Sequence, residues 1–268
     1  MSFISVNNVW QRYGDQVVLE GLNLQVAEGE FCTLVGTSGC GKSTFLRLLL
    51  GQETASKGHI LLDGQPLAGE PDASRGVVFQ RYSVFPHLSV LDNVALGLEL
   101  PRAPLLGRLF GKAKKAAREQ AAALLHKVGL GHALDKYPAQ LSGGMQQRLA
   151  IAQALIMKPR VLLLDEPFGA LDPINRGKLQ DLLLEVWQST SPRRTIVFVT
   201  HDVDEALYLG DRVAVLGASP GRVLAQIEVP FERPRNRARL FASLAFHALR
   251  EDIAERLDAD VLSGLAAA

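Results

Sequence analysis

Apolar and polar residues alternate along two segments near the N-terminus, residues 3–9 and 17–26, with Gly14 and Asp15 between them. Alternation with a period of two is typical of strands that bury one face, and a glycine between two such strands favours a tight turn. We therefore expect an antiparallel strand pair at the start of the chain.

Further along, the apolar residues form short continuous runs instead of alternating. Runs rich in Val, Ile and Leu are typical of strands that are buried on both faces of a parallel sheet. The clearest runs of this kind are residues 161–164 and 196–199. The segments expected to form strands here are residues 31–35, 59–62, 76–79, 161–165, 195–200 and 212–216.

Segments with helical character separate these runs. The predicted helices include residues 44–50, 113–128 and 143–157, each followed by a glycine or by a Lys-Pro pair that would stop it. Strands that alternate with helices predict a parallel α/β sheet, interrupted here by a helical insert at about residues 90–158. We expect one main domain over residues 1–230 and a short helical tail over residues 231–268.

Composition limits the classes of protein that fit. The chain has 268 residues, of which 47% are hydrophobic and 21% charged, and its net charge of +1 gives no general attraction to nucleic acid. The only cysteines, Cys32 and Cys40, lack metal-ligand spacing and suit a reducing compartment. The first residues lack a secretory pattern, and no apolar run approaches the roughly 20 residues of a membrane span. For work at a membrane, we expect a partner to recruit the chain.

The segment from Gly36 to Thr44 matches the phosphate-binding pattern G-x-x-x-x-G-K-[ST] and lies between a predicted strand and a predicted helix. Glycines let backbone amides converge on phosphate oxygens, Lys42 can reach the β- and γ-phosphates, and the Ser43 hydroxyl can bind Mg²⁺. The flanking elements disfavour the alternative, an ordinary glycine-rich turn. The residues expected to bind nucleotide here are Gly36, Thr37, Ser38, Gly39, Cys40, Gly41, Lys42, Ser43 and Thr44.

Cys40 lies inside this loop, where we expect a small tolerated residue and not a catalytic thiol. A bulky maleimide on Cys40 should block nucleotide binding, and ATP should protect the thiol.

The apolar run 161–165 ends in two carboxylates, Asp165 and Glu166. An acid at a strand end can hold Mg²⁺ through water, and an acid one residue later can act as general base toward the attacking water. The alternative is a solvated acidic turn, which the phosphate-binding loop upstream makes less attractive.

Two more polar residues follow predicted strands. His201 comes after residues 195–200 and can contact the γ-phosphate and orient the water, and Gln80 comes after residues 76–79, where its amide can bind Mg²⁺ or the water. An ordinary structural role fits either residue as well, so the residues alone leave both interpretations open.

Residues Leu141 to Arg148 read Leu-Ser-Gly-Gly-Met-Gln-Gln-Arg and lie about a hundred residues after the phosphate-binding loop. Ser142, Gly143 and Gly144 would open a helix whose amides can hold a second anion. Two such sites lie too far apart in one fold to share one nucleotide. The pair therefore predicts two copies of the chain that share two nucleotides.

Asp172, Asp202 with Glu205, and Tyr13 can each be explained by an ordinary structural role. Asp172 precedes Pro173 and should cap a helix, which is compatible with a contact across a dimer. Asp202 with Glu205 predicts another helix start without chemistry. Tyr13 could stack on adenine, although an exposed tyrosine on an edge strand usually has no such role.

Two basic stretches lie outside these motifs, and we expect both to be solvated faces. The first is the better candidate for lipid headgroups or a membrane partner, because apolar residues interleave with its charges. The first stretch consists of Arg102, Arg108, Lys112, Lys114, Lys115 and Arg118 around Leu105, Leu106, Leu109 and Phe110. The second consists of Arg233, Arg235, Arg237 and Arg239. The tail beyond it has apolar residues at helical spacing, namely Phe241, Leu244, Ala245, Ala248 and Leu249.

Together these motifs resemble the ATP-binding-cassette (ABC) transporter ATPases over about residues 3–225, in the order that is usual for the family. The resemblance implies an α/β P-loop NTPase with a RecA-like mixed sheet core, an antiparallel β-subdomain and an inserted helical subdomain. It implies ATP and Mg²⁺ as cofactors, with Ser43, Gln80 and Asp165 around the metal. It further implies that Tyr13 stacks on adenine and that Gln80 senses the γ-phosphate and the permease. For hydrolysis, Glu166 would be the general base and His201 the switch residue. Ser142 to Gly144 would bind the partner's nucleotide, and Asp172 would bridge the dimer.

A finer resemblance is to importer ATPases of the nitrate/sulfonate/taurine group, carried by residues 79–80, 85–94, 165–172 and 200–202 and by the short tail. Thr37 stands where that group usually has proline, Gln153 where it has arginine, and residues 101–115 resemble a small insertion. These departures concern the transported substrate more than ATP hydrolysis. Residues 80–85 also resemble, weakly, transporters for urea- or guanidine-like compounds.

The resemblance implies a peripheral ATPase subunit on the cytoplasmic face of a bacterial inner membrane. Its partners would be a second copy of the chain, two permease subunits docked near Gln80 and residues 85–90, and indirectly a periplasmic binding protein, with no nucleic acid. A chromosome-structure ATPase would need a long coiled coil or zinc-binding cysteines, and a translation-associated ATPase two cassettes. An exporter or lipid-trafficking subunit is disfavoured only by the finer resemblance.

Overall fold

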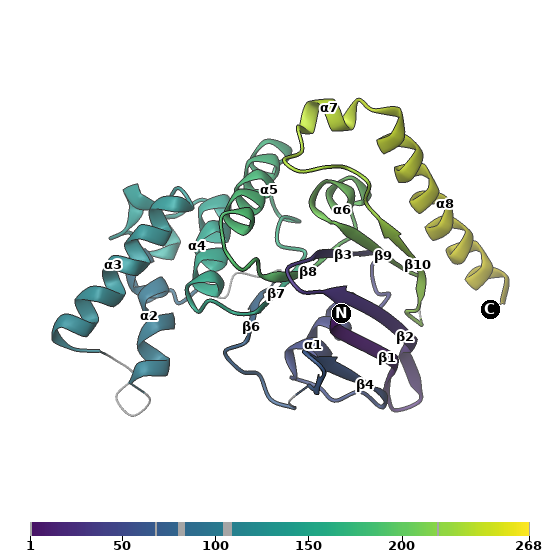
Figure 1. The fold of residues 1–268 in the computed structure, drawn as a ribbon, viewed down its shortest axis with the longest axis horizontal. Helices are drawn as coiled ribbons and strands as arrows, with labels where there is room; N and C mark the ends of the chain where they lie inside the picture. Colours follow the sequence, from purple (N-terminus) through teal and green to yellow (C-terminus); the bar gives the residue numbers. More distant parts are fainter. Residues whose placement is uncertain (1, 68, 80–83, 104–108, 219, 268) are drawn as a thin grey trace. The chain divides into compact units, whose positions relative to one another are not determined.

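The computed structural model describes residues 2–67, 69–79, 84–103, 109–218 and 220–267. The chain divides into two compact units, Met1–Asp72 with Pro192–Ala268 and Ala73–Ser191. We refer to them as the first and second units and describe each by itself (Figure 1).

An antiparallel sheet opens the first unit and confirms the predicted strand pair. Gly14, with φ of 58°, makes the turn between its first two strands, which are longer than the alternating segments predict. Alternate residues such as Val6 and Leu24 are buried, as the period of two requires. In spatial order the strands are β2 (Gln16–Ala27), β1 (Ser2–Tyr13), β4 (Lys57–Leu62) and β5 (Gln65–Pro66).

The parallel strands of the first unit form its core. The order is β10 (Val223–Glu228), β9 (Arg212–Leu216), β3 (Phe31–Gly36) and β8 (Thr195–Thr200). β3 runs parallel to both β8 and β9, β10 is antiparallel to β9, and every residue of β3 and β8 is buried. The continuous apolar runs therefore predicted β3, β8 and β9 correctly, because a strand covered on both faces has no polar side. β10 was not predicted, and its residues are partly buried or exposed.

The helices of this unit are α1 (Lys42–Leu50), α6 (Val203–Leu209), α7 (Arg237–Phe241) and α8 (Leu244–Ala267). Gly51, in the left-handed conformation with φ of 80°, ends α1 as predicted. α1 begins two residues earlier than the predicted start at Thr44.

The tail is helical, but the predicted apolar stripe has the wrong phase. Leu244 is 87% exposed, whereas Phe246 and Ile253 are buried. The reason is a break before α8, where the Ser243 hydroxyl accepts a hydrogen bond from the Phe246 N–H at 3.2 Å. Because a new helix starts there, spacing counted from Phe241 does not continue into α8.

The second basic stretch is also not the solvated face that the sequence predicts. Arg233 pairs with Asp211 at 2.7 Å, and Arg235 donates to the carbonyl oxygens of Leu207 at 3.1 Å and Tyr208 at 2.7 Å. Burial, assisted by the Arg233 charge, lowers the pKa of Arg235 to about 10. These arginines satisfy carbonyls at the end of α6, which a charge pattern in the sequence cannot reveal.

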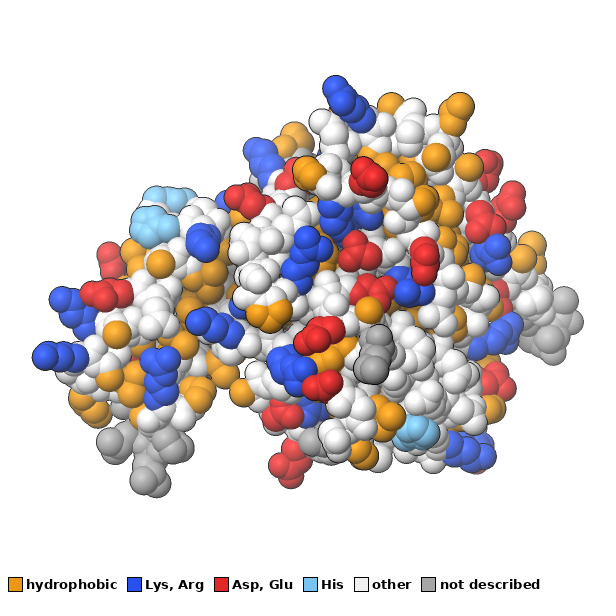
Figure 2. All heavy atoms as spheres, viewed as in Figure 1, with side chains coloured by type: hydrophobic (Ala, Val, Ile, Leu, Met, Phe, Trp, Pro, Cys, Tyr) orange, Lys and Arg blue, Asp and Glu red, His pale blue; other side chains and the backbone are white. Residues whose placement is uncertain are grey.

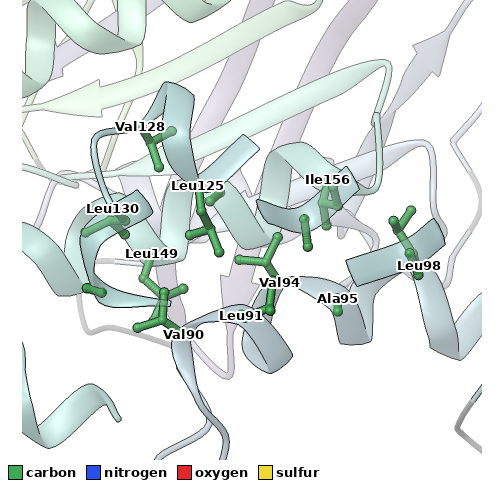
Figure 3. Packing of buried hydrophobic residues seen from close by; sticks show 14 of the residues in the cluster. Val90, Leu91, Val94, Ala95, Leu98, Leu125, Val128, Leu130, Leu149 and Ile156 are labelled. Atoms are coloured by element: carbon green, nitrogen blue, oxygen red, sulfur yellow. The ribbon is translucent and has the colours of Figure 1, made fainter. Parts of the chain in front are cut away.

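The second unit holds two parallel strands, β6 (Arg75–Val78) and β7 (Val161–Asp165), and the helices α2 to α5. α2, α3 and α4 pack together around buried residues such as Val94, Leu125 and Leu149 (Figure 3). The helical character predicted for about residues 90–158 agrees with these elements, while the predicted domain boundaries stay a prediction. The helices are α2 (Val90–Arg102), α3 (Gly111–Lys127), α4 (Gly143–Ile156) and α5 (Pro173–Gln188), with short 3₁₀ turns at Gly131–Ala133 and Pro138–Gln140.

The first basic stretch lies on α2 and α3, where Lys and Arg side chains stand among apolar ones (Figure 2). Arg118 pairs with Asp92, and Lys115 lies 4.0 Å from Glu119, while Phe110 is 70% exposed. Leu105, Leu106 and Arg108 lie outside the described residues. Nowhere in the described ranges is a helix both long and apolar enough to cross a membrane.

Candidate functional site

The phosphate-binding loop connects β3 to α1, and its glycines are required by the backbone. Gly39 and Gly41 have φ of 83° and 94°, which side chains other than glycine rarely adopt. A Cβ at Gly41 would also lie 2.6 Å from Leu19 Cδ2, and one at Gly36 would lie 2.7 Å from the Leu216 carbonyl oxygen. The sequence pattern is therefore present as a closely packed loop.

Lys42 lies inside this loop with only 5% of its surface exposed. Its Nζ donates hydrogen bonds of 2.8 Å to the carbonyl oxygens of Gly36 and Thr37. The ammonium is therefore held at the centre of the curled loop, beside the first turn of α1, where a phosphate would meet a positive charge and the helix amides. Ser43, in that first turn, is exposed.

Both cysteines are buried, Cys40 to 1% and Cys32 to 0% exposure. Burial raises the pKa of Cys32 well above its ordinary value, so this thiol is unreactive in the folded chain. A maleimide can reach Cys40 only when the loop opens, so protection of Cys40 by ATP stays a prediction about the opened loop.

Tyr13 is tied to α1 through Glu53, a residue that the sequence did not single out. The Tyr13 hydroxyl and the Gln11 amide both donate to Glu53 Oε2, and Arg47 pairs with the same carboxylate at 3.1 Å. Arg47 in turn donates to Thr44 Oγ1 at 3.1 Å, which links the network to the phosphate-binding loop. Burial, and next the hydrogen bond to Glu53, raise the pKa of Tyr13. Its ring remains 44% exposed.

His201 follows β8 at the same edge of the sheet as the phosphate-binding loop. Val35, just before the loop, lies opposite Thr200, just before His201, in the parallel pairing of β3 and β8. His201 is exposed at this edge. Asp202 caps α6 by accepting the Glu205 N–H at 3.1 Å, which confirms the predicted helix start.

In the second unit, β7 ends at Asp165 and is followed at once by Glu166. Glu166 has φ of 43°, a left-handed conformation that is costly for a residue with a side chain, and its carbonyl accepts the Gly169 N–H at 3.2 Å. Strain of this kind concentrates where a side chain must point in one direction for function. No sequence pattern signals it. Gln80, which follows β6, lies outside the described residues.

The Ser142 to Gly144 segment opens α4, as predicted. The Ser142 hydroxyl accepts the Met145 N–H at 3.4 Å, and Ser142 and Gly143 are exposed. At Gly144 a Cβ would meet Leu179 and Leu171 only at 3.8 and 3.9 Å, which is ordinary contact. The fold of this unit therefore does not itself require glycine at position 144.

Asp172 caps α5, with Pro173 in the first turn, and this prediction is also confirmed. Its carboxylate accepts hydrogen bonds from the Asn175 backbone N–H at 3.1 Å and from Asn175 Nδ2 at 2.6 Å. These bonds lower the pKa of Asp172, so the exposed carboxylate stays charged.

The predicted site residues thus fall into two groups, one in each unit. The first unit carries Tyr13, the phosphate-binding loop and His201, and the second carries Asp165, Glu166, Ser142 to Gly144 and Asp172. Among the residues that the structure describes, no three His, Cys, Asp or Glu side chains gather as a metal cluster.

Comparison with known protein families gives one clear match. A family model for the ABC transporter domain matches residues 19–169. An uncharacterised ABC transporter ATP-binding protein of Methanocaldococcus jannaschii is 44% identical over 262 residues, covering 97% of this chain and 92% of its own length. The nitrate transport protein NasD of Klebsiella oxytoca is 43% identical and covers 93% of this chain and 94% of its own.

A third relative is longer than this chain. The bicarbonate transport ATP-binding protein CmpC of Synechococcus elongatus is 43% identical over 94% of this chain, which corresponds to 37% of CmpC.

Solved structures with the same fold include CbiO1 from Clostridium perfringens, part of the ABC transporter complex CbiONQ. It superposes with a TM-score of 0.72 at 31% identity, over 90% of this chain and 91% of its own. A dimeric ATP-binding cassette in a post-hydrolysis state, bound to ADP and Pi, gives a TM-score of 0.69 at 30% identity, over 85% of this chain and 100% of its own.

Proposed function

The chain belongs to the ABC transporter ATPase family, and on this premise we propose that it hydrolyses ATP to drive import of a small anionic solute through partner permease subunits. ATP hydrolysis is the activity of the family. The direction of transport and the class of solute are the proposed part. The observation that carries the proposal is the pairing of an enclosed phosphate-binding loop with the open, glycine-bearing start of α4.

We assign the steps of hydrolysis to this chain's residues as follows. The loop amides and Lys42 bind the β- and γ-phosphates, since Lys42 can exchange its bonds to Gly36 and Thr37 for phosphate oxygens without leaving the loop. Glu166 accepts a proton from the water that attacks the γ-phosphorus, His201 orients that water, and the bond to the leaving ADP oxygen breaks.

The donor set fits magnesium, which prefers oxygen ligands. Ser43 would supply a hydroxyl, Asp165 a carboxylate through water, and Gln80 an amide oxygen. A bound Mg²⁺ would neutralise charge on the β- and γ-phosphates.

A second copy of the chain is required in this proposal. The start of α4 carries Ser142, whose hydroxyl caps its own helix, and the first amides of this helix belong to the exposed residues Ser142 and Gly143. We assign these amides to the γ-phosphate of a nucleotide held by the partner copy, with Asp172 at the interface between copies. The dimeric relative bound to ADP and Pi supports this arrangement.

The relatives point to an oxyanion as the solute. NasD carries the name of a nitrate transporter and CmpC that of a bicarbonate transporter, and both are 43% identical to this chain. Nitrate, bicarbonate and sulfonates share a planar or tetrahedral group of oxygens with a negative charge. We propose that such a solute is delivered by a periplasmic binding protein to permease subunits. This chain would dock on them from the cytoplasmic face.

Glu166→Gln tests the proposal most directly. With the permease in proteoliposomes, and with the binding protein and solute outside, we expect ATP-dependent uptake by the unaltered chain. The variant should bind ATP normally, lose about a thousandfold of its turnover and accumulate an ATP-bound dimer on size exclusion. Glu185→Gln, the same chemical change at an exposed position of α5, should behave like the unaltered chain.

Two results would contradict the proposal at different points. Undiminished steady-state hydrolysis by Glu166→Gln would remove Glu166 as the base while leaving the direction of transport open. Active uptake only from the side that carries the ATPase would instead identify an exporter.

A further inference from the structure

The turn between β9 and β10 is held by a residue of the C-terminal helix. Asp260 of α8 accepts the Ala218 N–H through Oδ2 at 2.5 Å and Arg222 Nη2 through Oδ1 at 2.5 Å. The Gly217 N–H also donates to the Arg222 carbonyl at 2.9 Å. One carboxylate therefore joins the two sides of this turn, which we call the β9–β10 turn.

The β9–β10 turn lies directly against the phosphate-binding loop. A Cβ built at Gly221 would lie 2.0 Å from the Cys40 carbonyl oxygen, and one at Gly36 would lie 2.7 Å from the Leu216 carbonyl oxygen. Real Cβ atoms essentially never approach so closely, so backbone meets backbone at both places. The loop that binds phosphate thus rests on the turn that Asp260 holds.

Hydrogen bonds fix the same turn to β2. The Gly221 N–H donates to the Val18 carbonyl at 2.8 Å, and the Glu20 N–H donates to the Gly221 carbonyl at 2.9 Å. Leu19, between those two residues, is the side chain that a Cβ at Gly41 would meet at 2.6 Å. A displacement of Gly221 would therefore reach the loop at both Cys40 and Gly41.

Asp260 is an unusual residue for its position on α8. Phe246, Ile253 and Asp260 are buried and lie seven residues apart, which is about two helical turns. An apolar side chain would dock this face of α8 without the desolvation cost that a carboxylate carries. The Asp260 side chain is only 6% exposed, so it depends on its two hydrogen-bond partners.

We propose that Asp260 is a positioning residue for the phosphate-binding loop. By fixing the β9–β10 turn, it sets the fraction of molecules in which Cys40 and Gly41 hold the conformation that binds ATP. A ligand's apparent affinity falls in proportion to that fraction, so loosening the turn raises the KM for ATP while kcat at saturating ATP changes little.

The two cysteines provide a readout that a merely structural role would not move. Cys40 lies against the turn, Cys32 is the second residue of β3, and both are buried. In Asp260→Ala, the rate at which Ellman's reagent modifies Cys40 should rise about tenfold, with the Cys32 rate unchanged and the Cys40 rate suppressed by ATP. The KM for ATP should rise by a similar factor.

Asp258→Ala serves as the matched control, because Asp258 is an exposed acid two residues away on the same helix. It should leave both cysteine rates and the KM unchanged. Where Asp260→Ala folds poorly, Asp260→Asn keeps the shape and one acceptor and should give the same selective change at smaller size. Arg222→Ala combined with Asp260→Ala should add little to either single change, since both act through one turn.

Equal acceleration at Cys40 and Cys32 would show general loosening of the fold and overturn the proposal. So would an unchanged KM and an unchanged Cys40 rate in Asp260→Asn.

Discussion

The starts of α1 and α4 are both open ends of helices that can bind an anion, yet they are built in opposite ways. At α1, contacts within the chain explain the residue types of the loop. There is no room for a Cβ at Gly36 or Gly41, and Lys42 is hydrogen-bonded to loop carbonyls. At α4, contacts within the unit do not explain the glycines. A Cβ at Gly144 would make only ordinary van der Waals contacts, and Gly143 is exposed. Glycines that internal packing explains belong to the fold. Packing within the second unit does not explain Gly144, and the proposed function explains it as part of the surface that a partner's nucleotide approaches.

Gly144→Ala should have the largest effect of the changes considered. We expect ATPase activity to fall about a hundredfold, because the added methyl group blocks close approach of the partner's nucleotide. The free energy of unfolding should instead rise by about 0.5 kcal/mol, since alanine replaces glycine in a helix without a clash. Urea denaturation and steady-state hydrolysis measure the two changes.

Lys42→Ala provides the contrast. Gly144→Ala and Lys42→Ala are each combined with Glu166→Gln. Both combinations should prevent formation of the ATP-bound dimer, but only Lys42→Ala should abolish binding of ATP to the single chain. If Gly144→Ala also loses ATP binding, then the start of α4 acts on the chain's own nucleotide and the two-copy arrangement is wrong.

Glu53→Gln tests whether ATP binding at α1 depends on contacts from residues of its own unit. The amide keeps the shape of the side chain but weakens its bonds to Tyr13 and Arg47. Arg47 in turn donates a hydrogen bond to Thr44 in the phosphate-binding loop. We expect the KM for ATP to rise about threefold, with little change in kcat. Glu255→Gln, at an exposed position of α8, is the control, and an equal effect there would remove Glu53 from the argument.

The smallest expected effect is the response of Tyr13 to alkali. Its pKa is raised in the folded chain, so its contribution to stability is complete below the ordinary value of 10.0 and is lost as pH rises through the folded value. The stability advantage of the unaltered chain over Tyr13→Phe should therefore shrink above about pH 10. Urea denaturation of both chains between pH 8 and 11 tests this, and parallel curves would refute it.

Much of the fold could be predicted from sequence because its core strands are short and apolar throughout. The bounds of β7, β8 and β9 match the predicted runs at both ends. The phosphate-binding loop, the Ser142 segment and the caps at Asp172 and Asp202 were equally legible. The loop needs glycine where φ is positive, and Ser142, Asp172 and Asp202 are residue types that commonly cap helix N-termini.

The misses have a shared cause. Glu53, Asp260 and Arg235 act on atoms that lie far away in sequence, and nothing local marks them. The left-handed backbone at Glu166 is likewise invisible in a residue name. The tail was different, because Ser243 was a readable helix start that would have corrected the phase of α8.

Arg233 and Arg235 donate hydrogen bonds to the carbonyl oxygens at the end of α6, and this has a practical consequence when the chain is shortened. A protein cut at residue 230 would keep every recognisable motif, but would strip the caps from the helix that begins just after His201. Segments without a sequence signature can supply contacts to segments that carry one, so trimming to the recognisable motifs would remove the hydrogen bonds to Leu207, Tyr208 and Leu209.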